Sequence, residues 1–299
     1  MTHREDSDLF RRFFTGRARE FLLRGIDLAL QEDGEDLTSR GLFAAEDEME
    51  ADLVAKEDTI VAGLPLLEII TYRFSGKMDV AVLEMVAEGG PAQKGECICR
   101  LRGSARTILK TERVMVNYIA HLSGIADLTH HFLSRIHGSG TRLLDTRKTL
   151  PGLRYPEKYA VRVGGGCNHR LDLAQMLMLK DNHIDRAGGI APAVARLRDA
   201  YSPCPPLVVE CRTLGEVEEA VFCGVDRVLL DNMDPETISL ALQMIPASVE
   251  SEISGGVNLE SLQELARLGA DYISSGALTD SAPFKDLSLR CELIGRRKQ

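Results

Sequence analysis

The stretch Pro206–Met233, PLVVECRTLGEVEEAVFCGVDRVLLDNM, decides the fold class. It begins with a short apolar run that ends in Glu210, continues through a helical segment, and closes with a second apolar run that ends in Asp231. Apolar runs that alternate with helices are typical of parallel strands with helices packed on both faces of the sheet. The stretch therefore predicts a parallel α/β sheet.

The same rhythm continues on both sides of this stretch, from Gly140 onward. A polar residue closes each of five apolar runs, at spacings of 30, 21, 23 and 21 residues: Lys180, Glu210, Asp231, Ser254 and Ser275. Barrel enzymes carry functional side chains at the C-terminal ends of successive strands, so we expect a TIM-like α/β barrel over residues 124–283. An open doubly wound sheet is the alternative, although it gathers its polar residues at one switch point.

The part of the chain before residue 124 has a different pattern. Apolar periodicity predicts helices over 17–30, 105–122 and 125–136, and short strands within 50–64 and 78–101. We therefore expect an N-terminal α+β domain over 17–123, with the tail 284–299 packed back on it. The charged residues 1–16 are expected to be loosely ordered.

Composition excludes several classes of protein. The net charge of -9 argues against general nucleic-acid binding. No apolar run reaches the roughly 18 residues that a membrane span needs, and the charged start of the chain lacks the apolar segment of a secretory signal. Seven cysteines with no CxxC pair indicate reduced thiols. We expect a cytoplasmic protein with neither a membrane nor a nucleic acid as partner.

Basic residues are concentrated between Asp145 and His183, where seven Lys and Arg face four acids, a local charge of 7 − 4 = +3. Arginine grips carboxylates in bidentate fashion and lysine adds a compact charge, so the stretch predicts a pocket for a multiply anionic ligand. The candidate residues are Arg147, Lys148, His169, Arg170 and Lys180. They converge if the first strands of the barrel are neighbours. Surface ion pairs are the alternative, which we prefer for Arg154, Lys158 and Arg162, scaffold residues in a helical segment with Glu157.

Acids and glycines follow the later strands. Glu210 and Asp231 could hold Mg²⁺ through water and substrate oxygens, or stabilise a developing positive charge; each could instead cap a helix. Backbone N–H groups of Ser254-Gly255-Gly256 and Ser275-Gly276 suit a phosphate, with a plain turn as the alternative. A phosphorylated sugar that meets an aromatic acid would satisfy both ends of such a site.

These residues carry a resemblance to a known family. The blocks DTRKTLPGLRYPEKYAVRVGGGCNHR, LKDNH, VVEC, LLDNM, ISGG and SSGALT closely resemble quinolinate phosphoribosyltransferases, as does TERVMVNYIAHLSGIA. The likeness runs from Asp36 to Phe284. It implies an N-terminal α/β sandwich domain and an open, seven-stranded barrel. It also implies the conversion of quinolinate and phosphoribosyl pyrophosphate (PRPP) to nicotinate mononucleotide, CO₂ and pyrophosphate, a step in NAD synthesis.

The resemblance also implies roles for single residues. Lys180, Glu210 and Asp231 would be catalytic, and Arg113 would reach the site of the other subunit in a homodimer. The quinolinate pocket would comprise Thr146, Arg147, Lys148, His169, Arg170 and Lys180. PRPP would contact Glu210, Asp231, Ser254, Gly255, Gly256, Ser275 and Gly276. Mg²⁺ would be held with PRPP by Glu210 and Asp231, and no organic cofactor is implied.

The chain departs from the family pattern at two positions. Asp280 stands where the family often has His, and Gln175 stands near a position that is commonly acidic. Three other functions remain open: a relative found beside molybdate transporters, a nicotinate-specific transferase, and a non-catalytic ligand sensor. The basic residues of EKYAV and NHR argue against the first, the number of cations against the second, and Lys180, Glu210 and Asp231 against the third.

Overall fold

The computed structural model describes residues 9–294, and the chain divides into two compact units. The first contains the chain up to His130, Leu150–Gly165 and the chain from Ala282 onward; the second contains His131–Thr149 and Gly166–Ser281. This division differs from the expected boundary at 123/124, which lies inside helix α5 (Ala105–Arg135). Helix α6 (Arg154–Val163), expected in the barrel domain, groups with the first unit.

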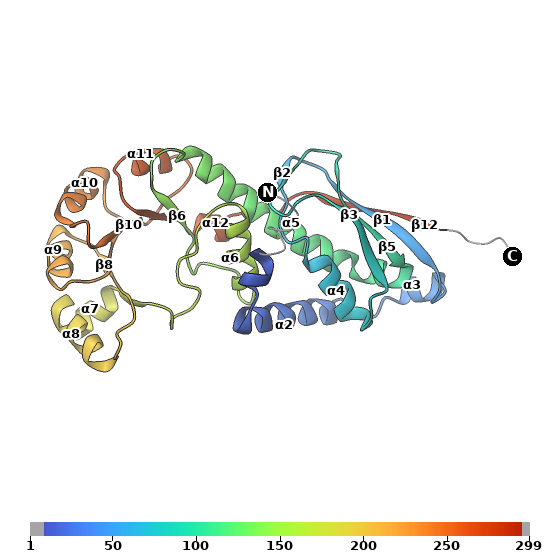
Figure 1. The fold of residues 1–299 in the computed structure, drawn as a ribbon, viewed down its shortest axis with the longest axis horizontal. Helices are drawn as coiled ribbons and strands as arrows, with labels where there is room; N and C mark the ends of the chain where they lie inside the picture. The colour runs from blue at the N-terminus through green and yellow to red at the C-terminus, as the bar shows by residue number, and fades with distance from the viewer. Residues whose placement is uncertain (1–8, 295–299) are drawn as a thin grey trace. The chain divides into compact units, whose positions relative to one another are not determined.

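The first unit is built on an antiparallel sheet with the strand order β12-β1-β5-β3. These strands are β1 (Glu48–Ala55), β3 (Val80–Met85), β5 (Cys97–Ser104) and β12 (Leu287–Ile294), and a separate pair is formed by β2 (Thr59–Ile60) and β4 (Pro91–Ala92). This unit also contains α2 (Gly16–Glu32), α3 (Leu37–Leu42) and α4 (Leu66–Ser75). Figure 1 shows β12 lying along β1, so the sheet combines the tail with strands from residues 48–104.

One helix replaces two that the sequence predicts. Residues 105–122 and 125–136 were expected to be separate helices, yet α5 is continuous from Ala105 to Arg135. The Ser123-Gly124 pair does not end it, because both residues are buried within the first unit. A Cβ atom on Gly124 would lie 1.8 Å from the carbonyl oxygen of Pro283, so the glycine serves close packing instead of a turn.

The expectation of a loosely ordered start is wrong for residues 9–16, while residues 1–8 lie outside the described part of the chain. Residues 9–13 are helical. The rings of Phe10, Phe13 and Phe14 lie 5.2–5.6 Å from the ring of Tyr159 on α6. Aromatic pairs at these separations are stabilising, and they anchor the segment despite its many charges.

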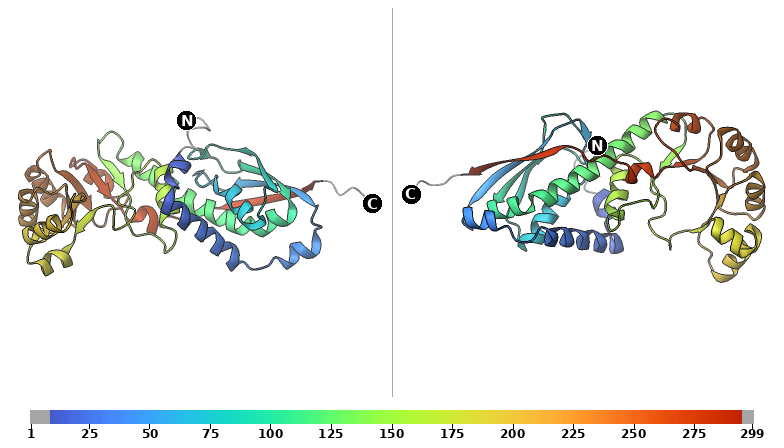
Figure 2. Two further views of the ribbon diagram at one scale, coloured as in Figure 1. Left: turned by 60° about the horizontal axis from the view of Figure 1, so that its bottom comes forward. Right: turned by 180° about the vertical axis from the view of Figure 1, so that it is seen from behind.

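The second unit contains a parallel sheet with the strand order β6-β11-β10-β9-β8-β7. The strands are β6 (Arg142–Leu144), β7 (Leu177–Leu179), β8 (Leu207–Cys211), β9 (Arg227–Asp231), β10 (Glu250–Ser254) and β11 (Tyr272–Ser274). Between them lie α7 (Asp181–Ala187), α8 (Ile190–Ala200), α9 (Leu214–Phe222), α10 (Pro235–Met244) and α11 (Leu262–Ala266), and α12 (Ala277–Asp280) follows β11. Figure 2 shows α7–α11 arranged around the outside of the curved sheet.

The sheet is parallel, as the alternating pattern predicts, but α7–α11 lie on its outer side, whereas the pattern predicted helices on both faces. Within residues 9–294 the parallel sheet has six strands. Cys167 forms one isolated parallel bridge with Leu144 of β6, at the end of the strand order. The strands β6 and β7 lie at opposite ends of the order, so they do not meet the condition, stated for convergence of the basic residues, that the first strands are neighbours. Within the described residues, no helix combines the length and the apolar content that a membrane span requires.

Candidate functional site

The second unit contains a cavity of about 710 Å³ at the C-terminal ends of its strands. Its lining includes every residue that the sequence analysis assigned to the site except Arg113: Thr146, Arg147, Lys148, His169, Arg170, Lys180, Glu210, Asp231, Ser254, Gly255, Gly256, Ser275 and Gly276. Basic residues come from segments after β6 and β7, and acids and glycines come from β8–β11. The cavity therefore brings together the two groups of residues that the sequence separates.

The basic residues meet although their strands are not neighbours. The segment 167–176 joins the two ends of the sheet. Asp145, fully buried after β6, accepts hydrogen bonds from the His169 backbone N–H at 2.8 Å and the Asn168 side chain at 2.6 Å. Arg170 Nη1 donates to the carbonyl oxygen of Met176, just before β7, at 2.9 Å. These contacts carry the basic residues of the segment from one sheet edge to the other.

Two arginines in the cavity repel each other. Burial lowers the pKa of Arg170, and the charge of Arg147 lowers it further. An anion placed between the two guanidinium groups would relieve both effects, because it restores a favourable environment for the charged form. This part of the cavity is therefore suited to a carboxylate.

Lys180 and Glu210 link the two groups of residues. Lys180 Nζ donates to Glu210 Oε2 at 2.5 Å, and the exposed fractions of their side chains are 43% and 16%. Lys180 directly follows β7, and Glu210 lies near the end of the adjacent strand β8. Lys180 was expected at the dicarboxylate end and Glu210 at the sugar end, and the ion pair joins these two ends.

Asp231 is oriented by its neighbour Asn232. Asn232 Nδ2 donates to Asp231 Oδ2 at 2.8 Å, and its backbone N–H donates to the carbonyl oxygen of Ser254 at 3.0 Å. Asn232 has φ 53°, a left-handed conformation that Asn tolerates better than most residues. A Cβ on Gly255, whose φ is +93°, would lie 2.3 Å from Asn232 Oδ1. Only glycine fits beside this asparagine.

The two serines assigned to phosphate differ in what they can offer. Ser254 Oγ shares a hydrogen bond with Ser274 Oγ at 3.0 Å and lines the cavity. Ser275 uses both donors internally, since its backbone N–H donates to Leu144 and its hydroxyl to the carbonyl oxygen of Val257. Ser275 lines the cavity, but it has no donor left for a phosphate.

The two acids suit a metal ion that arrives with its substrate. Glu210 and Asp231 line one cavity from the adjacent strands β8 and β9. Within residues 9–294, no group of three or more His, Cys, Asp or Glu could hold a metal ion. Mg²⁺ keeps several waters and is usually bound by one or two carboxylates together with substrate phosphates. The acids therefore fit Mg²⁺ bound with a phosphorylated substrate, and do not form a cage.

The other residues that the sequence singled out lie partly inside and partly outside the cavity. Arg113 is exposed on α5, in the first unit. Arg154, Lys158 and Arg162 lie on α6 and do not line the cavity, as the scaffold interpretation requires, but Lys158 is 0% exposed and so makes no surface ion pair. Asp280 lines the cavity, whereas Gln175 does not and accepts from the Leu171 N–H at 2.7 Å.

Asn232 and Glu252 are two of the cavity-lining residues that were not predicted from the sequence. Asn232 directly follows a strand-end acid, which is a signal for a left-handed turn. Glu252 is an acid in the middle of the buried strand β10, and such an acid indicates a buried partner.

Comparison with known proteins agrees with this geometry. Family models match residues 36–123 and 125–290, as the N-terminal and C-terminal domains of quinolinate phosphoribosyl transferase. The chain is 41% identical to the probable nicotinate-nucleotide pyrophosphorylase (carboxylating) of Bacillus subtilis, over 85% of this chain and 87% of that protein. It is 38% identical to quinolinate phosphoribosyltransferase (decarboxylating) 1b of Nicotiana tabacum, over 91% of this chain and 84% of that protein.

A solved structure shares the fold. The crystal structure of NadC from Streptococcus pyogenes is 36% identical and superposes with a TM-score of 0.85, covering 90% of this chain and 96% of that one. The two domains, the parallel sheet and the residues of the cavity lead to one conclusion: the chain belongs to the quinolinate phosphoribosyltransferase family.

Proposed function

We propose that this protein is a decarboxylating quinolinate phosphoribosyltransferase. It transfers the phosphoribosyl group of PRPP to quinolinate, releases pyrophosphate and CO₂, and forms nicotinate mononucleotide for NAD synthesis. One observation carries the proposal: a single cavity has a cationic end at Arg147, Lys148 and Arg170, and a glycine-rich end at Ser254, Gly255 and Gly256. Quinolinate has two carboxylates and PRPP carries phosphates, so each substrate matches one end.

The reaction depends on positioning and charge stabilisation. Arg147 and Arg170 hold the quinolinate carboxylates with the ring nitrogen facing C1 of the ribose. As the bond from C1 to pyrophosphate breaks and the bond from nitrogen to C1 forms, positive charge develops at C1. The carboxylates of Glu210 and Asp231 stabilise this charge from adjacent strand ends. Mg²⁺, held by the same two acids through water and PRPP, would offset the charge of the departing pyrophosphate.

Decarboxylation follows from the new charge on the ring. Alkylation of the nitrogen makes the ring a cation. The bond between C2 and its carboxylate then breaks, CO₂ departs, and the electron pair remains on C2 beside the positive nitrogen until a proton arrives. Nicotinate lacks the 2-carboxylate and would leave a cation of the pocket unpaired, which costs affinity.

The finer architecture is part of the proposal. We infer that the parallel sheet forms an open barrel in which the bridge at Cys167 stands for the seventh strand. We also propose a homodimer in which Arg113 reaches the pocket of the other subunit. Its exposure on α5, with Val114 and Met115 buried beside it, supports this role.

An activity assay tests the function. The protein is incubated with PRPP, Mg²⁺ and either quinolinate labelled in its 2-carboxylate or nicotinate. We expect labelled CO₂ and nicotinate mononucleotide from quinolinate, no comparable product from nicotinate, and loss of turnover when a chelator removes Mg²⁺. Absence of CO₂ release with quinolinate would refute the proposal. Product from nicotinate alone would favour a nicotinate-specific transferase.

A further inference from the structure

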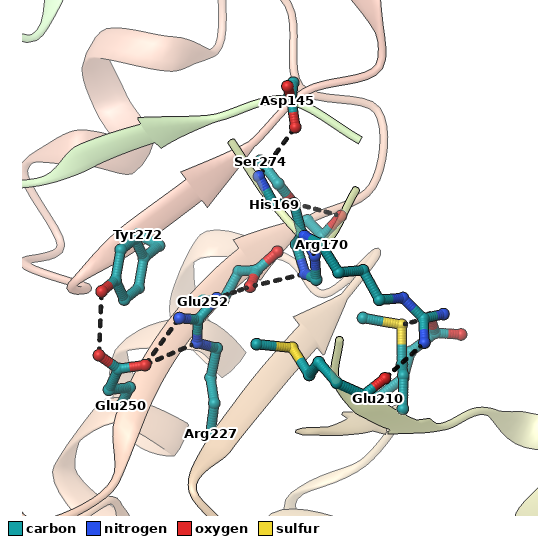
Figure 3. Close-up of polar contacts among 12 residues, drawn as sticks. Asp145, His169, Arg170, Glu210, Arg227, Glu250, Glu252, Tyr272 and Ser274 are labelled. Carbon is teal, nitrogen blue, oxygen red and sulfur yellow. Dashed lines mark hydrogen bonds and ion pairs between the residues drawn. The ribbon is translucent and has the colours of Figure 1, made fainter. Parts of the chain in front are cut away.

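A series of polar side chains runs through the interior of the second unit to the cavity (Figure 3). The Tyr272 hydroxyl donates to Glu250 Oε1 at 2.9 Å. Arg227 donates to Glu250 through Nε and Nη2 at 2.9 and 2.7 Å, and to Glu252 through Nη1 at 2.8 Å. The guanidinium of Arg227 also lies 4.0 Å from the centre of the Tyr272 ring. Arg227 thus bridges the half-exposed Glu250 and the buried Glu252.

Glu252 is the buried end of this series. It is 0% exposed and lines the cavity from β10. Burial raises the pKa of its carboxyl, and hydrogen bonds from Ser274 and Arg227 oppose that effect. A buried carboxylate persists only when it is paired, and Arg227 Nη1 supplies that pairing at 2.8 Å.

His169 connects Glu252 with Arg170. Its Nε2 lies 3.5 Å from Glu252 Oε2, and its Nδ1 accepts the backbone N–H of Arg170 at 2.7 Å. A ring nitrogen that accepts a hydrogen bond carries no proton, so the proton resides on Nε2, which faces the carboxylate. This arrangement requires the neutral ring.

We propose that Glu252 and His169 are positioning residues that act on quinolinate through Arg170. The proposal rests on the function proposed above. Glu252 fixes the imidazole, and the imidazole fixes the backbone of Arg170. The Arg170 guanidinium, bonded to the carbonyl oxygen of Met176, is then held in place against the like charge of Arg147. His169 was expected to contact the substrate, and we assign it this indirect role instead.

A spectroscopic experiment tests the protonation of His169 without any substrate, so its outcome does not depend on the proposed function. The full chain is labelled with ¹⁵N-histidine, and two-bond ¹H–¹⁵N spectra are recorded at pH 7. The resonances of His169 are those lost in His169→Gln. We expect the neutral ring with its proton on Nε2. An imidazolium, or a proton on Nδ1, would overturn the proposal.

Steady-state kinetics test the action through Arg170. Glu252→Gln keeps the acceptor and removes the charge, so we expect the KM for quinolinate to stay within about threefold of wild type. Glu252→Leu removes the acceptor and should raise that KM about tenfold or more, while the KM for PRPP does not change. In a His169→Ala background, Glu252→Leu should not raise the KM for quinolinate further, because both substitutions break the same series of contacts from Glu252 through His169 to Arg170. Glu250→Gln, at the other end of the series, is the control and should leave both KM values unchanged.

Three results would contradict the proposal: an equal rise in both KM values with Glu252→Leu, additive effects in the double variant, or a loss in Glu252→Gln as large as in Glu252→Leu. The last result would mean that Glu252 acts through its negative charge and not as a hydrogen-bond acceptor for His169. If Glu252→Leu does not fold, the glutamine variant and the histidine spectra still decide.

Discussion

At the scale of a single residue, Lys180 links the basic residues of the pocket to Glu210. Its Nζ is 2.5 Å from Glu210 Oε2. Lys180→Ala removes a cation beside the reacting groups and leaves Glu210 without its partner. We expect kcat/KM to fall about 100-fold or more, the loss typical of one charge-stabilising group, with little change in melting temperature. Arg212→Ala is the control, because Arg212 pairs with Glu216 on the surface. Comparable losses in the two variants would count against a catalytic role for Lys180.

Asn232 permits a matched pair of substitutions. Asn232→Gly accepts the φ of 53° and loses only the side chain, whereas Asn232→Ala also strains the backbone. We expect Asn232→Ala to lower the free energy of unfolding by about 1 kcal/mol more than Asn232→Gly, measured by urea denaturation. Activity should fall similarly in both, since both release Asp231. Equal unfolding free energies would show that the left-handed conformation costs nothing here.

Residue identities were predictable from the sequence where strand position decides them. Lys180, Glu210, Asp231 and Ser254 end apolar runs, and parallel strands bring such ends together. The pairing of Lys180 with Glu210 and the contact between Glu252 and His169 were not predictable. They depend on which strands become neighbours, and residues such as Arg227 and Glu252 are far from His169 in the sequence.

The Ser254-Gly255-Gly256 turn shows at the scale of an element how glycine shapes the phosphate end. In Gly255→Ala the new Cβ would be 2.6 Å from the backbone nitrogen of Asn232, so the turn must move. We expect the KM for PRPP to rise at least about tenfold, with a smaller effect on quinolinate. Gly269→Ala provides a control, because Gly269 has φ +85° but nothing within 4 Å of a Cβ. If Gly269→Ala raises this KM as much, backbone strain alone explains the effect.

Element types were more predictable than their limits. The alternation around Pro206–Met233 correctly predicted the strands β8 and β9 and the intervening helix α9. The break predicted at Ser123-Gly124 was wrong, because a glycine in a helix and a glycine in a turn look alike until the packing of Pro283 is known. The order of residues 9–16 was also predicted wrongly. The prediction gave weight to their charges and none to three aromatic rings that pack on Tyr159.

The proposed dimer can be tested at the scale of the whole molecule. If Arg113 acts in the pocket of the other subunit, Arg113→Ala and Lys180→Ala inactivate different sites. Mixing the two inactive proteins under conditions that exchange subunits should restore about a quarter of wild-type activity per dimer, because half of the dimers are mixed and each has one intact site. Each variant alone, treated identically, is the control. No recovery, although both variants dimerise and exchange, would exclude donation across the interface.

The position of β12 in the sequence determines when the sheet of the first unit can be completed during synthesis. Its partner β1 ends at Ala55, and β12 begins at Leu287, 287 − 55 = 232 residues later. At the usual pace of translation, about 5–20 residues per second, β1 waits roughly 10–50 s on the ribosome for that partner. Throughout this interval one edge of its sheet is unpaired, the condition under which strands aggregate or recruit chaperones. The part of the chain that is made first is therefore finished last.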